Sequence, residues 1–176
     1  NSCRMLIARP TGSRFEIVDA FSKSIRLGLD LERTGELSQA GISRALQALH
    51  VCAKKLNKFG VRNSRLVATE ACRRSKNGKS FLSKVKKETG LTLELIKPEE
   101  EARLAVISCA PLFDPNFSHV LIVDIGGGST ELVWMDLSEV PKENRIAEML
   151  KLQLGFQNSN KSEFAKSNKD FVKIGH

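Results

Sequence analysis

The residues from Asp124 to Glu131 carry the clearest chemical pattern in the sequence. They read Asp-Ile-Gly-Gly-Gly-Ser-Thr-Glu and lie between two apolar runs, one beginning at Val120 and one ending at Trp134. Consecutive glycines bring backbone N–H groups close to an anion without obstructing Cβ atoms. The hydroxyl groups of serine and threonine add further donors. We therefore predict a strand, a phosphate-binding turn and a second strand. The predicted phosphate-binding residues here are Gly126, Gly127, Gly128, Ser129 and Thr130.

Asp124 stands at the end of the first apolar run, where it can hold Mg²⁺ directly or through water. This hard cation prefers oxygen ligands and keeps part of its hydration. Three glycines alone would fit a plain hairpin turn equally well, but the complete pattern favours phosphate binding. Elsewhere in the chain, Gly78 precedes a lysine and a serine, which is the order that ends a P-loop motif. Arg73 stands where the first glycine of that motif belongs, so we expect Gly78 at a helix N-terminus instead.

Positive charge is concentrated in one segment of the chain. The formal net charge is +8, yet residues 54–87 hold twelve basic residues and one acidic residue, so the rest of the chain is slightly acidic. A solvated surface on two helices is one explanation, and an electropositive surface for a polyanion is the other. Arg73 and Arg74 are the best candidates in this segment for phosphate contacts. Few aromatic residues interrupt the segment, which argues against nucleic acid as a specific partner.

Length and composition bound the other possibilities. The chain has 176 residues, of which 41% are hydrophobic, enough for one ordinary domain or for one domain and part of another. Its four cysteines and three histidines show no zinc spacing and no disulfide framework. We therefore expect a reduced, cytoplasmic compartment. No apolar run approaches the roughly 20 residues of a bilayer span, so no membrane segment is predicted.

The order of elements predicts an α/β fold. Residues 4–8 and 15–27 read as antiparallel strands, and residues 65–69, 92–96, 119–124 and 130–135 read as further strands. Apolar residues at helical spacing run from Ser38, a good N-cap, to Gly60. Asn77 is expected to cap a second helix that ends at Gly90, and Pro98 to open a third. Strands that alternate with helices after an antiparallel start indicate a mixed sheet with flanking helices.

Four motifs in order resemble the Ppx/GppA phosphatase family, within the superfamily of actin, sugar kinases and Hsp70. Residues 1–9 are similar to the second half of its first phosphate loop, whose pattern ends in Asn-Ser. Residues 68–77 are similar to its T-x-x-x-R-x-x-x-N segment. Residues 100–104 resemble its Glu-Glu-Ala-Arg helix start, and residues 124–131 resemble its second phosphate loop.

The resemblance implies two actin-like lobes with an active site between them. Residues 1–117 would form the first lobe without its first strand, residues 118–156 would begin the second lobe, and residues 157–176 would be a poorly ordered or divergent tail. The family is commonly dimeric, through parts that we expect to lie outside this sequence. The sequence then reads as one lobe and the beginning of another, too short to close the active-site cleft.

The resemblance also implies roles for single residues. Glu101 would be the general base that activates water, and Arg73 would bind phosphate oxygens. Asn1 and Ser2 would contribute to phosphate binding, and Asp124 and Glu131 would lie near Mg²⁺. For the glutamates of residues 99–101, stabilisation of the helix N-terminus is the alternative role. For Arg73 the alternative is an ion pair with the glutamate three residues earlier.

These roles imply hydrolysis of a terminal phosphoanhydride in inorganic polyphosphate or in guanosine pentaphosphate, with release of orthophosphate. Both substrates present the same group to the loops, so the choice between them stays open. A non-catalytic polyanion-binding fragment is the alternative, because we expect half of the cleft to be missing. A kinase that uses ATP shares the loops of the superfamily, but the adenosine pocket would lie in sequence that this chain does not contain.

Overall fold

The computed structural model describes residues 1–12, 14–126 and 130–151, except the side chains of Arg14 and Glu131. The chain divides into two compact units, Asn1–Ile96 and Lys97–His176, which are described separately below. The predicted tail, residues 157–176, lies outside the described residues. None of the helices in the described part is long and apolar enough to cross a membrane.

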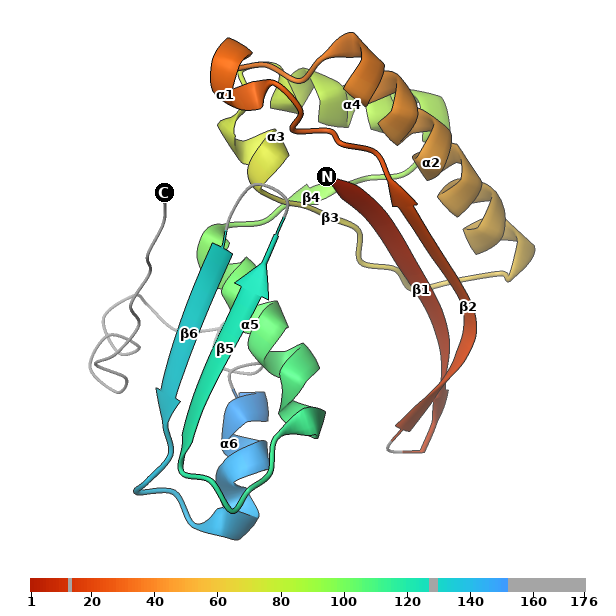
Figure 1. Ribbon diagram of the computed structural model, residues 1–176. Coiled ribbons are helices and arrows are strands. Elements are labelled where there is room, and N and C mark those ends of the chain that lie inside the picture. Colours follow the sequence, from red (N-terminus) through yellow and green to blue (C-terminus); the bar gives the residue numbers. More distant parts are fainter. Residues whose placement is uncertain (13, 127–129, 152–176) are drawn as a thin grey trace. The chain divides into compact units, whose positions relative to one another are not determined.

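The first unit opens with a long antiparallel hairpin (Figure 1). Strand β1 (Ser2–Thr11) pairs with β2 (Arg14–Ser24), and the register shifts after Ile7, where β2 carries one extra residue. Cys3, Met5 and Ile7 alternate with exposed residues along β1, so one face of the hairpin is the more buried. The predicted antiparallel pairing is confirmed; β1 is longer than the predicted strand at 4–8, and β2 ends three residues earlier than the predicted strand at 15–27.

Helix α2 (Gln39–Lys58) follows the short helix α1 (Leu31–Thr34). The Oγ of Ser38 accepts a hydrogen bond from the Gly41 amide at 3.2 Å, which confirms the predicted N-cap. The buried face of α2 packs into a core shared with β1, β2, α3 and α4. This core contains Ile25, Leu27, Leu37, Ile42, Ala45, Leu46, Ala48, Ala68, Cys72, Phe81 and Val85.

The predicted strands at 65–69 and 92–96 are shorter than expected. They form β3 (Val67–Ala68) and β4 (Glu94–Leu95), which pair in parallel. Between them lie α3 (Glu70–Arg74) and α4 (Gly78–Thr89), and Gly90 ends α4 with a φ of 74° as predicted. A parallel pair needs a crossover between its strands, and these two helices supply it.

The predicted side-chain cap at Asn77 is wrong. Asn77 precedes α4, but its side chain makes no capping hydrogen bond. Instead its Oδ1 accepts from the Leu37 amide at 2.8 Å, and its Nδ2 donates to the Leu37 carbonyl at 2.9 Å. The side-chain amide of Asn77 thus satisfies both the N–H and the carbonyl of the buried Leu37, ahead of α2. If Asn77 capped α4 instead, these two backbone groups would lose their partner.

Gly78 lies at a helix N-terminus, as predicted, and the packing there excludes any larger residue. A Cβ added to Gly78 would overlap the Cys72 carbonyl and approach the Ser75 hydroxyl oxygen to 2.8 Å. We therefore expect Gly78→Ala to lower the free energy of unfolding by about 1–3 kcal/mol, because α3 and α4 must separate. Urea unfolding measures this. Ser80→Ala, an exposed change on the same helix, is the control and should stay within about 0.5 kcal/mol; equal losses would contradict the steric explanation.

The second unit packs helices against another antiparallel hairpin. Helix α5 (Pro98–Cys109) and the 3-10 turn η1 (Ala110–Leu112) precede β5 (His119–Ile125) and β6 (Thr130–Asp136). The turn η2 (Lys142–Asn144) and helix α6 (Arg145–Lys151) follow. The core between the hairpin and these helices contains Val106, Ala110, Ile122, Val133, Met135, Leu137 and Met149.

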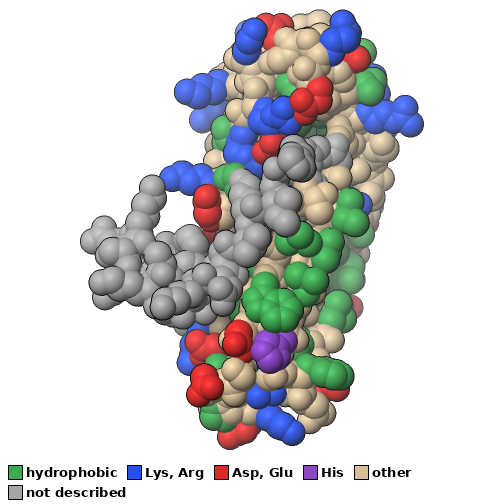
Figure 2. Space-filling model, turned by 60° about the vertical axis from the view of Figure 1, so that its left-hand side comes forward, with side chains coloured by type: hydrophobic (Ala, Val, Ile, Leu, Met, Phe, Trp, Pro, Cys, Tyr) green, Lys and Arg blue, Asp and Glu red, His purple; other side chains and the backbone are tan. Residues whose placement is uncertain are grey.

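The opposite face of the β5–β6 hairpin is apolar and exposed. Its exposed large hydrophobic residues are Leu121, Val123, Ile125 and Trp134. They occupy the alternate strand positions, so they point away from α5. Figure 2 shows hydrophobic side chains gathered on one side of the molecule. Within the described residues, helices therefore cover one face of the hairpin and leave the other exposed.

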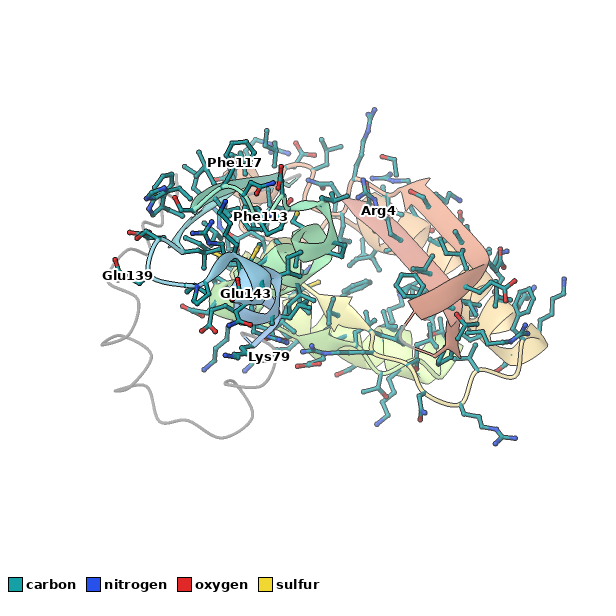
Figure 3. All side chains as sticks on the ribbon, turned by 90° about the horizontal axis from the view of Figure 1, so that it is seen from below. Arg4, Lys79, Phe113, Phe117, Glu139 and Glu143 are labelled. Atoms are coloured by element: carbon teal, nitrogen blue, oxygen red, sulfur yellow. The ribbon has the colours of Figure 1, made fainter. Side chains whose placement is uncertain are left out.

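Arg145, in the second unit, is a buried charged residue with a relative exposure of 7%. Its Nε donates to the carbonyls of Leu137 and Val140, at 3.1 and 3.0 Å. Its Nη1 donates to the carbonyls of Pro115 and Phe117, at 2.9 and 3.2 Å. Figure 3 labels Phe117 and shows the loop that leads into β5. A single guanidinium thus connects the start of α6 to the loop that precedes β5 and to the loop that follows β6.

The boundary between the compact units falls earlier than the predicted lobe boundary. Helix α5 belongs with the second unit because Val106 packs against Ile122 and Val133 of the hairpin. The predicted division at residues 117 and 118 concerns the two lobes of the family and stays a prediction. The α/β fold class with an antiparallel start is confirmed.

Candidate functional site

The end of the β5–β6 hairpin holds most of the predicted phosphate and metal residues. Asp124 pairs in register with Glu131, and Ile125 with Thr130, so the glycine loop follows directly on the last pair. The predicted strands on both sides are confirmed. Gly127, Gly128 and Ser129 lie outside the described residues, whereas Gly126 and Thr130 are described and exposed.

Asp124 is exposed at the loop end of the hairpin. Residues two apart on a strand share a face, so Asp124 lies on the same face as the buried Ile122, the face that α5 covers. Glu131 occupies the register position directly opposite. Among the described residues, no group of three or more His, Cys, Asp or Glu side chains is close enough to hold a metal ion. Any Mg²⁺ here would therefore rely on one or two carboxylates, water and substrate oxygens, which is how proteins commonly bind it.

The first turn of α5 carries three consecutive glutamates in three different environments. Glu100 accepts from Nε and Nη2 of Arg103, both at 2.6 Å, and both side chains are largely buried. Glu99 is exposed, and Glu101 is partly buried. Successive side chains on a helix point about 100° apart, so the side chain of Glu101 points in a different direction from those of Glu100 and Ala102. The ion pair with Arg103 gives Glu100 a structural role, and Glu101 stays the candidate base that the family resemblance implies.

The start of helix α5 lies at the end of the hairpin where β5 ends and β6 begins. Ala102, one residue after Glu101, packs against the core beneath the hairpin. Figure 1 shows the N-terminal end of α5 at the end of the hairpin where β5 ends and β6 begins. The structure thus brings the start of α5, with Glu101, to the hairpin end that carries Asp124.

Arg73 makes the ion pair that was weighed against phosphate binding. Its Nη2 donates to Glu70 Oε2 at 2.7 Å, and its Nη1 donates to the Ile96 carbonyl at 2.9 Å. The side chain is 14% exposed. Arg73 therefore connects α3 to the residue that follows β4, and these contacts hold its guanidinium in a fixed position.

Asn1 lies against the helix that carries Arg73. Its Oδ1 accepts from the Gly28 amide at 2.9 Å, and its carbonyl accepts from the amides of Ile25 and Arg26. A Cβ on Gly28 would lie 3.3 Å from Asn1 Oδ1 and 3.6 Å from the Ala71 methyl group. Gly28 is thus a residue of this region that the sequence analysis missed, because no local pattern marks it. Ser2, which follows, is exposed and pairs with Ser24 of β2.

The predicted site residues fall into two groups, one in each unit. Asn1, Ser2 and Arg73 belong to the first, and Glu101 and residues 124–131 belong to the second. In the basic segment Arg74 is also paired, with Glu32 at 2.6 and 3.0 Å. This pairing raises the pKa of Arg74 and lowers that of Glu32, chiefly through the side-chain hydrogen bonds. The exposed lysines of the segment are Lys54, Lys58, Lys76, Lys79, Lys84, Lys86 and Lys87.

Comparison with known proteins places this arrangement among the actin-like α/β proteins. The model of the Ppx/GppA phosphatase family matches residues 6–166. The chain belongs to this family.

Solved structures agree with that assignment. The Aquifex aeolicus PPX-GPPA enzyme is 38% identical, with a TM-score of 0.68 over 78% of this chain and 46% of that one. Another Aquifex aeolicus Ppx/GppA structure is 29% identical, with a TM-score of 0.64 over 90% and 60%. An exopolyphosphatase-like protein is 30% identical, with a TM-score of 0.72 over 81% and 44%. The chain spans about half the length of these structures.

Proposed function

We propose that this chain contributes to the hydrolysis of a terminal phosphoanhydride, in inorganic polyphosphate or in guanosine pentaphosphate, with release of orthophosphate. The observation that carries the proposal is made at one end of the second unit. There Asp124, at the end of β5, and the glutamate-rich start of α5 are brought together. Membership of a phosphatase family supports the same reaction class.

The phosphate would be held mainly by backbone and hydroxyl donors. Phosphoryl transfer needs little covalent work from the protein, so positioning and charge stabilisation account for most of the catalysis. The amides of residues 126–128 and the hydroxyls of Ser129 and Thr130 would bind oxygens of the terminal phosphate. From the first unit, Asn1, Ser2 and Arg73 are proposed to bind further oxygens.

Glu101 is proposed to orient the attacking water and to accept its proton. A carboxylate within hydrogen-bond reach of water can serve as a general base, and this contributes typically 10²–10⁴-fold to a rate. Glu100 is less suited to the task because its two oxygens accept from Arg103. Glu99 is exposed on another side of the helix. The assignment therefore rests on the different environments of three adjacent residues of one type.

Mg²⁺ fits the donor chemistry of the hairpin end. Asp124 and Glu131, opposite each other in the ladder, would hold it, and both are hard oxygen ligands. When bound, the ion would offset negative charge on the phosphate oxygens. The residues of the chain would still have to hold the substrate and move the proton of the water.

A polyanion-binding role without catalysis is the second candidate. The observation in its favour is the set of exposed lysines on α2 and α4, whose charges are available to an anion at the surface. Such binding would depend strongly on salt and would be indifferent to Glu101.

Phosphate release distinguishes the two candidates. Long-chain polyphosphate and guanosine pentaphosphate are each incubated with Mg²⁺ and either this chain or a version extended at both ends to the length of its solved relatives. Orthophosphate release by the extended version, above a blank without protein, is the expected result. Binding of polyphosphate by both versions without orthophosphate release from either would overturn the hydrolase proposal and favour the polyanion-binding one.

A further inference from the structure

Two thiols from distant parts of the sequence meet inside the first unit. The Sγ atoms of Cys3, on β1, and Cys52, on α2, are 3.9 Å apart, although 49 residues separate them. Cys3 is partly buried and Cys52 is 3% exposed. Cys3 packs against the core to which the buried face of α2 belongs. The contact therefore joins the first strand to the longest helix.

The two sulfur atoms of this pair lie in van der Waals contact. A disulfide has an S–S length of about 2.05 Å, so the two sulfurs would need to approach by roughly 2 Å. A change in the χ1 angle of a cysteine swings its sulfur over a distance of this order while the backbone stays in place. Cys3 is the partner that can turn, because it lies on a strand and is partly exposed. Within the described residues, Cys3 and Cys52 are the two cysteines whose sulfur atoms lie in contact.

We propose that Cys3 and Cys52 form a reversible disulfide that fixes the beginning of β1 to α2. The oxidant is a peroxide. The Cys3 thiol first reacts with hydrogen peroxide to give a sulfenic acid and one water, the O–O bond being broken. The Cys52 sulfur then attacks the Cys3 sulfur and displaces its hydroxyl group, which leaves as a second water with the Cys52 proton. The two thiols lose two electrons, and the peroxide gains them. A small dithiol reverses the bond by exchange.

The surroundings of the two thiols make this bond slow to form at neutral pH. Burial raises the pKa of the Cys3 thiol above its ordinary value, and burial raises the pKa of Cys52 to about 12. The thiolate is the reactive form, so only a small fraction of either group reacts at any moment. This protects the pair from brief exposure to oxidants while leaving sustained exposure effective.

The bond would act on the residues proposed to bind phosphate at the start of β1. Asn1 and Ser2 directly precede Cys3, and Asn1 is held by hydrogen bonds to Gly28, Ile25 and Arg26. A link from Cys3 to α2 would limit the movement of this segment around a bound anion. This consequence rests on the proposed function, whereas formation of the disulfide does not.

Mass spectrometry tests the bond without reference to activity. The chain is exposed to hydrogen peroxide for hours at neutral pH, the remaining thiols are alkylated, and the intact mass and peptide map are recorded. We expect loss of two hydrogens, a linked pair of peptides containing Cys3 and Cys52, and complete reversal by dithiothreitol. Closure of this loop should also raise the Tm by roughly 5–10 °C relative to the reduced protein.

Matched variants separate the pair from general cysteine oxidation. Cys3→Ser and Cys52→Ala should each abolish the linked peptides and the rise in Tm. Cys72→Ser, which removes a buried thiol elsewhere in the same unit, should leave both unchanged. Four alkylatable thiols after sustained oxidation of the unmodified chain, or linkage through Cys72 or Cys109, would overturn the proposal. Absence of phosphatase activity would leave these readouts intact and would count only against the proposed function.

Discussion

Arg145→Met is expected to lower the free energy of unfolding of the second unit by about 3–5 kcal/mol. The change removes the arginine donor from the carbonyls of Val140, Pro115 and Phe117, and it removes one of two donors from the Leu137 carbonyl, which also accepts from the Val140 amide. A polar group that loses its partner and stays desolvated costs about 1–3 kcal/mol, so the loss of the arginine donor from several carbonyls together reaches the expected value. Methionine fills a similar volume, so the loss reflects hydrogen bonding more than a cavity.

Fluorescence can follow this unfolding in the second unit alone. The chain has one tryptophan, Trp134, and it lies on β6 of the hairpin that Arg145 supports. Urea titrations of the variant and the unmodified chain, monitored at this residue, give the difference directly.

Lys151→Met is the control for the loss of one positive charge on α6. Its partner Glu148 is 2.8 Å away, and both side chains are exposed. Such surface ion pairs contribute about 0–1 kcal/mol. Arg145→Lys should fall between the two variants, since an ammonium group keeps the charge but has three donors rather than five. If Arg145→Met were as stable as Lys151→Met, the carbonyl cluster would not be a stabilising feature.

Local patterns predicted the elements that depend on neighbouring residues. Ser38 caps α2 because its hydroxyl reaches an amide three residues later, and such a short-range interaction is visible in the sequence. The ion pair of Arg73 with Glu70 is likewise an i, i+3 contact on one short helix. The strands around the glycine loop followed from two apolar runs with a turn between them.

Contacts between distant residues could not be predicted in this way. Asn77 bonds to Leu37, 40 residues earlier, and this tertiary interaction replaced the cap expected from local rules. Arg145 reaches Pro115, 30 residues away, and nothing in the sequence around it distinguishes it from a surface arginine. The environments of Glu99, Glu100 and Glu101 also depended on the fold, since three adjacent residues of one type look alike until their neighbours are known.

Glu101→Gln is expected to lower the kcat for orthophosphate release by roughly 10²-fold or more, with little change in KM. The experiment uses the version extended to the length of the solved relatives and polyphosphate as substrate. Glutamine keeps the size and the hydrogen-bonding capacity of the side chain but cannot accept a proton from water at neutral pH. The loss should therefore appear in the chemical step and not in binding.

Glu99→Gln is the matched control, because it removes the same charge from the same helix turn. Negative charges at a helix N-terminus contribute about 0.3–1 kcal/mol to stability, and both variants lose one of them. Any difference in kcat between the two variants thus reports on position, not on the helix dipole. Equal activity in Glu101→Gln, Glu99→Gln and the unmodified protein would remove Glu101 from the chemistry. Its place in the first turn of α5 would then be explained by helix stabilisation alone, and the base would have to be sought among other residues.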